Sequence, residues 1–203
     1  MKCLWSFSHL VVYPIFHNLL GIRVYNSENL KLDKSAVVAA NHQSNWDPPV
    51  VGFSIYPHQP YFIAKTDLFK IHPVYTWLLR TYHSIEINPV KRDVRAIKTG
   101  LSKIEQNYWL IIFPEGTRKR KEQLKDIKAG AAFFSIKTNV PIIPCFINYS
   151  TLSLKKLWWG KSHISVTFGK PIYPSTKSLT LSQKAELMAN QWKMQMEELC
   201  QLK

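Results

Sequence analysis

Short apolar runs alternate along the chain with longer segments whose apolar residues recur every three or four positions. Residues 36–40 (AVVAA), 109–113 (WLIIF) and 141–147 (PIIPCFI) are brief and almost entirely apolar. Such runs are typical of strands buried on both faces, as in a parallel sheet. Residues 162–168 (SHISVTF) instead alternate between apolar and polar, which predicts a half-exposed strand nearer an edge.

Three longer segments carry a helical pattern. Residues 93–109 and 128–139 lie between the apolar runs, and a last helix is predicted over residues 180–201. In the second helix, Gly130 and Ala131 are expected to permit a close approach to the sheet. The apolar stripe of the first helix is Val94, Ile97, Leu101, Ile104 and Tyr108, and that of the last is Leu181, Ala185, Met188, Trp192 and Leu199. The last stripe is interpreted as a core contact.

This order of elements predicts an α/β fold with a largely parallel central sheet flanked by helices. In such folds, ligands gather beyond the carboxyl ends of the strands. Two of the three buried runs end in polar loops, which contain Asn41-His42 and residues 114–118. A functional site is therefore expected where these two loops meet.

The net charge of the chain limits the classes of partner that it is expected to bind. Among 203 residues, 27 are Lys or Arg and 13 are Asp or Glu, a net charge of +14. Such a chain favours nucleic acid, an anionic membrane or phosphorylated substrates. No helix-turn-helix, zinc-finger or RNA-recognition signature is present, so a nucleic-acid-binding domain is kept only as an alternative.

Three widely spaced cysteines indicate a reducing compartment rather than a disulfide framework.

The N-terminal segment, residues 4–22, is apolar but interrupted by polar residues. It barely reaches the roughly 20 apolar residues of a membrane span. An interfacial helix fits, with Trp5, Phe7, Tyr13 and Phe16 among the headgroups, and so does a helix packed on the domain. The chain is accordingly divided into an interfacial helix, residues 1–20, and one domain, residues 21–203.

The sequence AANHQSNWDPP, residues 39–49, places His42 five residues before Asp47. On a helix, the two would lie about 140° apart, so the spacing suits a loop that folds back. Asp47 and Pro48 are typical of a helix N-cap and first turn. A lone histidine is most often a surface or core residue, and an Asp before a proline is most often only a cap. Together, after a buried strand, they form a candidate base and its orienting carboxylate.

No serine or cysteine in a nucleophile setting accompanies this pair, since Ser44 is close but lies in no nucleophile elbow. The nucleophile is therefore expected to be a hydroxyl group of the substrate, which describes acyl transfer to an alcohol. Residues 113–116 (FPEG) suit a type I turn. Thr117 and Arg118 after it could bind a phosphate through a hydroxyl and a guanidinium group. Taken alone, the segment is better interpreted as a turn before a solvated basic helix end.

Four blocks in order resemble the glycerolipid acyltransferases, and specifically the lysophosphatidate (1-acyl-glycerol-3-phosphate) acyltransferases. NHQSNWDP looks like the family's His-four-residues-Asp motif, and FPEGTR, some seventy residues later, like its third block. Residues 64–80 (AKTDLFKIHPVYTWLLR) resemble the second block and residues 140–145 (VPIIPC) the fourth. The resemblance covers residues 20 to 175, and it implies a glycerol-phosphate acyltransferase-like fold.

The resemblance also implies roles. His42 would be the general base on the acceptor hydroxyl and Asp47 its charge partner, while Glu115, Gly116, Thr117 and Arg118 would bind the acceptor phosphate. Asn41 and Lys65 are further candidates for substrate contact. The donor would be a fatty acyl thioester on acyl carrier protein or coenzyme A, and the product phosphatidate, made by acylation at the sn-2 hydroxyl. No metal or other cofactor is expected, and the enzyme would work on the cytoplasmic face of an anionic membrane, as a peripheral or monotopic protein.

One position departs from the family pattern. The second block usually ends in an arginine, and this chain has Pro89 there. Lys91, Arg92 or Arg95 could supply the charge from downstream. Another lysophospholipid or amphiphile therefore remains an alternative acceptor, and a non-enzymatic domain that binds anionic membranes or nucleic acid is a second alternative.

Overall fold

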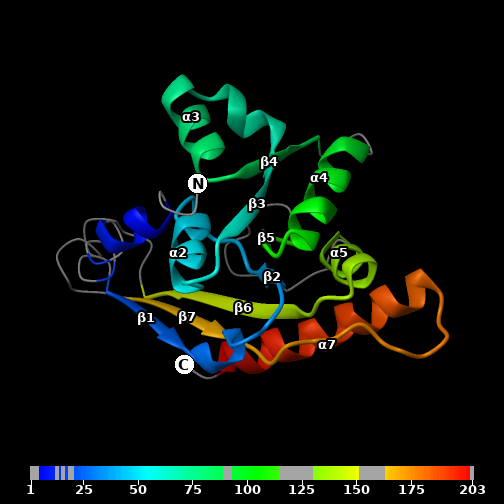
Figure 1. Ribbon diagram of the computed structural model, residues 1–203. Coiled ribbons are helices and arrows are strands. Elements are labelled where there is room, and N and C mark those ends of the chain that lie inside the picture. Colours follow the sequence, from blue (N-terminus) through cyan, green and yellow to red (C-terminus); the bar gives the residue numbers. More distant parts are fainter. Residues whose placement is uncertain are drawn as a thin grey trace.

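A computed structural model describes residues 5–11, 14, 17, 21–88, 93–114, 130–150 and 163–201. Within them, seven strands form one sheet in the order β1-β7-β6-β2-β5-β3-β4 (Figure 1). The strands are β1 (Ile22–Tyr25), β2 (Val37–Ala40), β3 (Pro60–Lys65), β4 (Ser84–Ile87), β5 (Trp109–Ile112), β6 (Ile142–Tyr149) and β7 (Ile164–Phe168). The α-helices are α2 (Asp47–Ser54), α3 (Pro73–Thr81), α4 (Val94–Glu105), α5 (Gly130–Thr138) and α7 (Leu181–Gln201), with short 3₁₀ segments η1 (Ser27–Leu30) and η2 (Thr66–Lys70).

The sheet is largely parallel, which confirms the expected fold class. Neighbouring strands run parallel at every pairing except that of β6 with β7. The apolar runs became β2, β5 and β6, and the alternating run became β7, which lies second from the edge. The strands β1, β3 and β4 were not expected from the pattern. β1 (IRVY) and β4 (SIEI) are as short as β2 and β5, but each includes a charged residue, so no continuous apolar run marks them in the sequence.

The side chains of β2 show how the sheet divides the core. Val38 and Ala40 lie in one apolar cluster with Val50 and Val51 of α2. Val37 and Ala39 lie in a second cluster, which includes residues of α4, α5 and α7. Because successive side chains of a strand point to opposite faces, a fully apolar strand needs helices on both sides. That requirement explains why β2 carries no polar residue.

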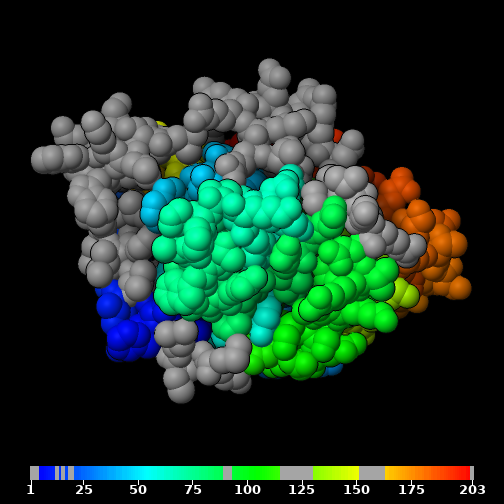
Figure 2. Space-filling view, turned by 90° about the horizontal axis from the view of Figure 1, so that it is seen from above, coloured from blue at the N-terminus to red at the C-terminus, as the bar shows by residue number. Residues whose placement is uncertain are grey.

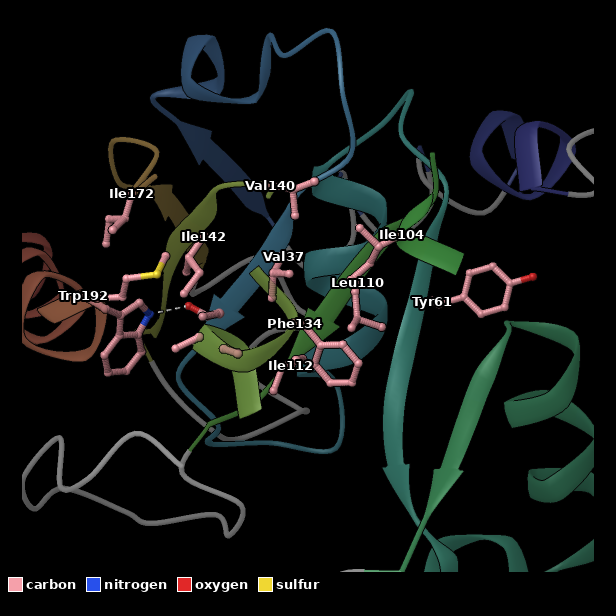
Figure 3. Close-up of a cluster of buried hydrophobic side chains, with 14 of the residues drawn as sticks. Val37, Tyr61, Ile104, Leu110, Ile112, Phe134, Val140, Ile142, Ile172 and Trp192 are labelled. Atoms are coloured by element: carbon pink, nitrogen blue, oxygen red, sulfur yellow. Dashed lines mark hydrogen bonds between the residues drawn. The ribbon is translucent and has the colours of Figure 1, made fainter. Parts of the chain in front are cut away.

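Figure 3 shows the second cluster, in which α7 packs against α5 and β6. The Trp192 indole Nε1 donates a hydrogen bond of 2.9 Å to the backbone carbonyl of Ala39 in β2 (Figure 3). Met188, Trp192 and Leu199 are buried as the stripe of the last helix predicted, and Met196 joins them. Leu181, at the start of the helix, is exposed instead, since it precedes the part of α7 that covers the sheet.

Two details of the predicted helices were wrong. Val94 is exposed, and Ala96 and Gly100 are buried in addition to the predicted Ile104. Leu101 and Tyr108 of the predicted stripe pack against the same cluster. Gly130 has open space around it, so it does not allow the close approach that was expected. Gly100 has that role, because a Cβ atom there would lie 2.6 Å from Cε1 of Phe134 in α5. At Gly100 the close packing joins two helices, whereas Ala131 is buried in the cluster that includes Val37 and Ala39 of β2, as expected for a helix on the sheet.

The helix at residues 5–11 agrees in part with both interpretations of the N-terminal segment, because one side packs on the domain and the other is exposed. Trp5 is buried and stacks on Phe53 of α2 at 5.5 Å between ring centroids, so it is not free to sit among headgroups. Phe7, Leu10 and Val11 are exposed. Tyr13 and Phe16 lie outside the described residues. Among the described helices, none has the length and apolar character needed to cross a bilayer.

Candidate active site

The loop that leaves β2 is held to the neighbouring strand β6 by Asn41. Its side-chain amide is buried, donates a hydrogen bond of 2.9 Å to the carbonyl of Ile147 and accepts one of 2.7 Å from the Ile147 N–H. These bonds continue the pairing of β2 with β6 beyond the last strand residue. In the structure, Asn41 thus fixes the loop that carries His42, and its contact with a substrate stays a prediction.

Asp47 is fully buried at the start of α2, and each carboxylate oxygen has donors. Its Oδ2 accepts hydrogen bonds from the backbone N–H of Gln43 at 2.6 Å and of Ser44 at 2.8 Å. The helix cap differs from the prediction, because the N-cap is Trp46 and Asp47 is the first helical residue. The carboxylate points back into the loop rather than forward into the helix, because two backbone donors of the loop converge on it.

The same Oδ2 atom lies 2.7 Å from Nδ1 of His42. A carboxylate on one ring nitrogen fixes the tautomer and the orientation of an imidazole. It leaves Nε2 as the nitrogen that can take a proton from a substrate. The His42 side chain is 16% exposed, so the ring is accessible while its partner is not. The predicted pair of His42 and Asp47 is therefore present in the structure.

Tyr149, the last residue of β6, completes the environment of the carboxylate. Its hydroxyl donates a hydrogen bond of 2.6 Å to Oδ1 of Asp47. Burial, with the nearby Asp47 charge, raises the pKa of the Tyr149 phenol well above its usual range, so the phenol stays a donor. Sequence reasoning missed this residue, because nothing near Tyr149 marks it and 102 positions separate it from Asp47.

Cys145 of β6 lies in the same region and is fully buried. Desolvation and the Asp47 charge raise the pKa of its thiol well above its usual range. Only a thiolate is a strong nucleophile, so this cysteine is inert at neutral pH. The expectation that the substrate supplies the nucleophile gains support from this finding.

The sheet brings the second polar loop to His42. β2 and β5 are adjacent parallel strands in which Ala39 pairs with Ile112. Phe113 follows β5, and its ring lies 4.5 Å from that of His42 between centroids. Phe113 opens the segment FPEGTR, so two motifs some seventy residues apart meet at one edge of the sheet. Glu115, Gly116, Thr117 and Arg118 themselves lie outside the described residues.

Lys65 ends β3 at the same carboxyl edge of the sheet. β5 stands between β3 and β2, so Lys65 is two strand spacings, about 10 Å, from the strand that leads to His42. This places the lysine on the correct edge without bringing it into contact with His42. Its role in substrate binding stays a prediction.

A cavity of about 230 Å³ lies elsewhere, around the amino ends of β3 and β5. Its lining includes Trp5, His58, Gln59 and Trp109, and neither His42 nor Asp47 contributes to it. It is separate from the candidate site, which lies at the opposite, carboxyl ends of these strands. Across the described part of the chain, no cluster of three or more His, Cys, Asp or Glu side chains could hold a metal ion.

The fold and the pair together define an α/β protein with a histidine held by a buried carboxylate at the carboxyl edge of its sheet. That arrangement is typical of catalysts that use histidine as a general base on a hydroxyl group. A family model described as Acyltransferase matches residues 21–148, more than half of the chain. The chain belongs to this acyltransferase family, which confirms the predicted resemblance.

Individual relatives agree with the family. The chain is 28% identical to the 1-acyl-sn-glycerol-3-phosphate acyltransferase of Bacillus subtilis, over 75% of this chain and 74% of that protein. It is 28% identical to the enzyme of that name from Streptococcus pneumoniae, over 78% of this chain and 58% of that protein. A probable enzyme of that name from Mycoplasma pneumoniae is 33% identical, over 66% of this chain and 52% of that protein. The chain thus spans little more than half the length of two of these relatives.

A solved structure supports the fold. The crystal structure of the 1-acyl-sn-glycerophosphate (LPA) acyltransferase PlsC from Thermotoga maritima aligns with a TM-score of 0.70 at 25% identity. The alignment covers 96% of this chain and 79% of that one.

Proposed function

We propose that this protein transfers a fatty acyl group from an acyl thioester to the sn-2 hydroxyl of lysophosphatidate, giving phosphatidate for phospholipid synthesis. The observation that carries the proposal is the His42–Asp47 pair in contact with Phe113, the first residue of FPEGTR. The relatives named 1-acyl-sn-glycerol-3-phosphate acyltransferases support the choice of acceptor. Membership in the acyltransferase family supports the type of reaction.

In this proposal, Nε2 of His42 removes the proton from the acceptor hydroxyl while its oxygen attacks the thioester carbonyl. The imidazolium that forms is stabilised by the Asp47 carboxylate at 2.7 Å. Collapse of the tetrahedral intermediate breaks the carbon–sulfur bond and forms the ester. The thiolate leaves and takes up the proton from His42, so the pair returns to its starting state. General-base catalysis of this kind accelerates the reaction by about 100-fold to 10,000-fold.

The substrates would meet at the carboxyl edge of the sheet. Glu115, Gly116, Thr117 and Arg118 would bind the acceptor phosphate, because their segment begins at Phe113 beside His42. Lys65 and Asn41 are proposed as further substrate contacts, and Lys65 could stabilise the developing oxyanion. The donor is proposed to be the thioester of acyl carrier protein or coenzyme A. The chemistry proposed requires no metal or other cofactor.

A different lysophospholipid acceptor is the second candidate, and Pro89 is the feature that favours it. The arginine that the family pattern places there would bind an acceptor phosphate, and a proline side chain cannot. The transfer chemistry would be the same, so only the specificity for the acceptor separates the two candidates.

The protein is also proposed to act at the cytoplasmic face of an anionic membrane, held there without a span. The net charge of +14 and the exposed Phe7, Leu10 and Val11 of the N-terminal helix support this. Basic proteins gain free energy close to anionic lipid headgroups, and both proposed substrates carry acyl chains.

Replacement of the base tests the reaction. For His42→Ala, we expect kcat for acyl transfer to lysophosphatidate to fall by about 100-fold to 10,000-fold, because the general base is lost. Circular dichroism should show an unchanged fold. His58→Gln is the matched control, because His58 lies just before β3, at the amino ends of the strands and away from His42. Wild-type activity in His42→Ala, or an equal loss in both variants, would contradict the assignment of the base.

A panel of substrates tests the specificity. The purified protein is given lysophosphatidate, other lysophospholipids and glycerol 3-phosphate, each with acyl carrier protein and coenzyme A thioesters, and products are identified by mass. The proposal requires the highest kcat/KM with lysophosphatidate. A preference for a lysophospholipid that lacks a terminal phosphate would establish the second candidate.

A further inference from the structure

The helix α3 exposes an apolar face although it belongs to the folded domain. Val74 and Trp77 are 65% and 64% exposed, and Leu78 is 42% exposed. At 3.6 residues per turn, these three side chains fall within an arc of about 100°. Ile71, just before the helix, is 65% exposed. We call these four residues the α3 face.

The other side of α3 is fixed to the domain. Tyr75, Thr76 and Leu79 are half-buried, and the helix packs on η2 and β4. The Thr76 hydroxyl donates a hydrogen bond of 2.6 Å to the backbone carbonyl of Phe69. Figure 2, the view from above, shows η2 and α3 as a broad teal surface turned toward the viewer. The apolar side chains therefore point outward from a helix that is held in place.

Charge identifies the partner that would cover this face. Lys70 and Arg80 are exposed near the two ends of the α3 face, and the whole chain carries +14. An apolar strip with a central tryptophan and basic residues at its ends matches the boundary between acyl chains and anionic headgroups. A soluble monomer rarely exposes a large cluster of apolar side chains unless it binds a protein, a ligand or a membrane there, and the basic residues at both ends of this cluster favour an anionic membrane.

The position of α3 extends the surface that the N-terminal helix offers. Tyr82, the residue after α3, donates a hydrogen bond of 3.2 Å to Oγ of Ser8 and packs edge-on against Trp5. The exposed Phe7 and Leu10 thus belong to a helix that lies against the end of α3. β3, which leads into η2 and α3, ends at the carboxyl edge of the sheet, where the His42 loop also lies.

We propose that the α3 face inserts into the headgroup region of an anionic lipid bilayer and is a docking element in its own right, besides residues 1–20. This inference rests on the proposed function, which supplies the reason for the protein to dock on a membrane. Docking through α3 would hold the protein at the surface in which both proposed acyl-chain substrates reside.

The test compares two variants of the full chain. Val74→Gln/Trp77→Gln/Leu78→Gln removes the apolar face, and Met194→Gln is the control, because Met194 is equally exposed at 69% but lies on α7. Partition is measured by co-sedimentation with vesicles of phosphatidylcholine and of an equal mixture of phosphatidylcholine and phosphatidylglycerol. We expect the triple variant to lose at least about tenfold in partition coefficient on both vesicles. The control should bind like the wild type.

A third variant separates charge from apolar contact. Arg80→Gln should lower partition to the anionic vesicles about fivefold and leave partition to phosphatidylcholine alone unchanged. The effect should vanish in high salt, because the charge is exposed and screened.

Unchanged partition of the triple variant would overturn the proposal. So would a wild-type dimer in solution that the triple variant converts to a monomer with unchanged vesicle binding, since the face would then be a contact between copies. Activity on lysophosphatidate dispersed in detergent is measured in parallel. Loss of vesicle binding with intact detergent activity supports docking, whereas a wild type inactive in detergent would refute the proposed function and leave the vesicle result standing.

Discussion

At the scale of single residues, the carboxylate of Asp47 connects the whole candidate site. One of its oxygens accepts hydrogen bonds from His42 and from two backbone N–H groups, and the other accepts one from Tyr149. A buried carboxylate is costly unless donors surround it, and four donors meet that requirement here. The sequence predicted His42 and Asp47 because they lie close together along the chain. Tyr149 could not be predicted, because a hydrogen bond across 102 positions leaves no local pattern.

Tyr149→Phe tests whether this hydroxyl positions the catalytic pair. We expect kcat to fall about tenfold with little change in KM, because Asp47 loses a donor while the substrate loses no contact. Stability should fall by about 1.5–3 kcal/mol, the range for a hydrogen bond to a charged group. Steady-state kinetics and urea denaturation measure the two effects. A loss of stability with unchanged kcat would restrict Tyr149 to a structural role.

At the scale of elements, the composition of a strand and the length of a helix decided whether the sequence could predict that element. The central strands β2, β5 and β6 are apolar on both faces, and α7 is long enough to show its period. β1 and β4, at the two edges of the sheet, are no shorter than β2 and β5, but each includes a charged residue, so no apolar run marks them. The helix α3 buries no residue, so no core stripe marks it as part of the domain.

Trp192→Phe tests how α7 is attached to the sheet. We expect the free energy of unfolding to fall by about 2–3 kcal/mol, because the buried Ala39 carbonyl loses its indole donor and a void remains. Urea denaturation measures this. Met194→Ala, on the exposed side of the same helix, should change stability by less than about 0.5 kcal/mol. Equal effects of the two substitutions would show that the hydrogen bond to β2 contributes little.

At the scale of the whole molecule, two half-buried histidines are expected to make stability depend on pH. Burial lowers the pKa of His58, against an opposing hydrogen bond to the Leu30 backbone. The pKa of His83 is lowered by burial and by the charge of Lys103. Because the folded pKa lies below the unfolded value of about 6.5, the unfolded state binds more protons in the window beneath that value. Stability should therefore fall as the pH drops from 7 to 5.

Urea midpoints of the wild type and of His83→Asn at pH 7, 6 and 5 check this prediction. Asn tolerates the positive φ of 60° at this position and does not titrate. The decline between pH 7 and pH 5 should be smaller in the variant. An identical decline would show that His83 contributes nothing to the pH dependence.

The sequence by itself determined the class of fold, the sites of the polar loops and the pairing of His42 with Asp47. These features depend on residues that are close together in the sequence, such as the positions of a short apolar run or the five positions between His42 and Asp47. Only the tertiary structure decided which strands are adjacent, that Phe113 lies against His42, that Tyr149 reaches Asp47, and that α3 turns its apolar side chains outward. Each of these depends on how distant segments share one sheet, and a linear pattern does not record distances between segments that meet only on folding.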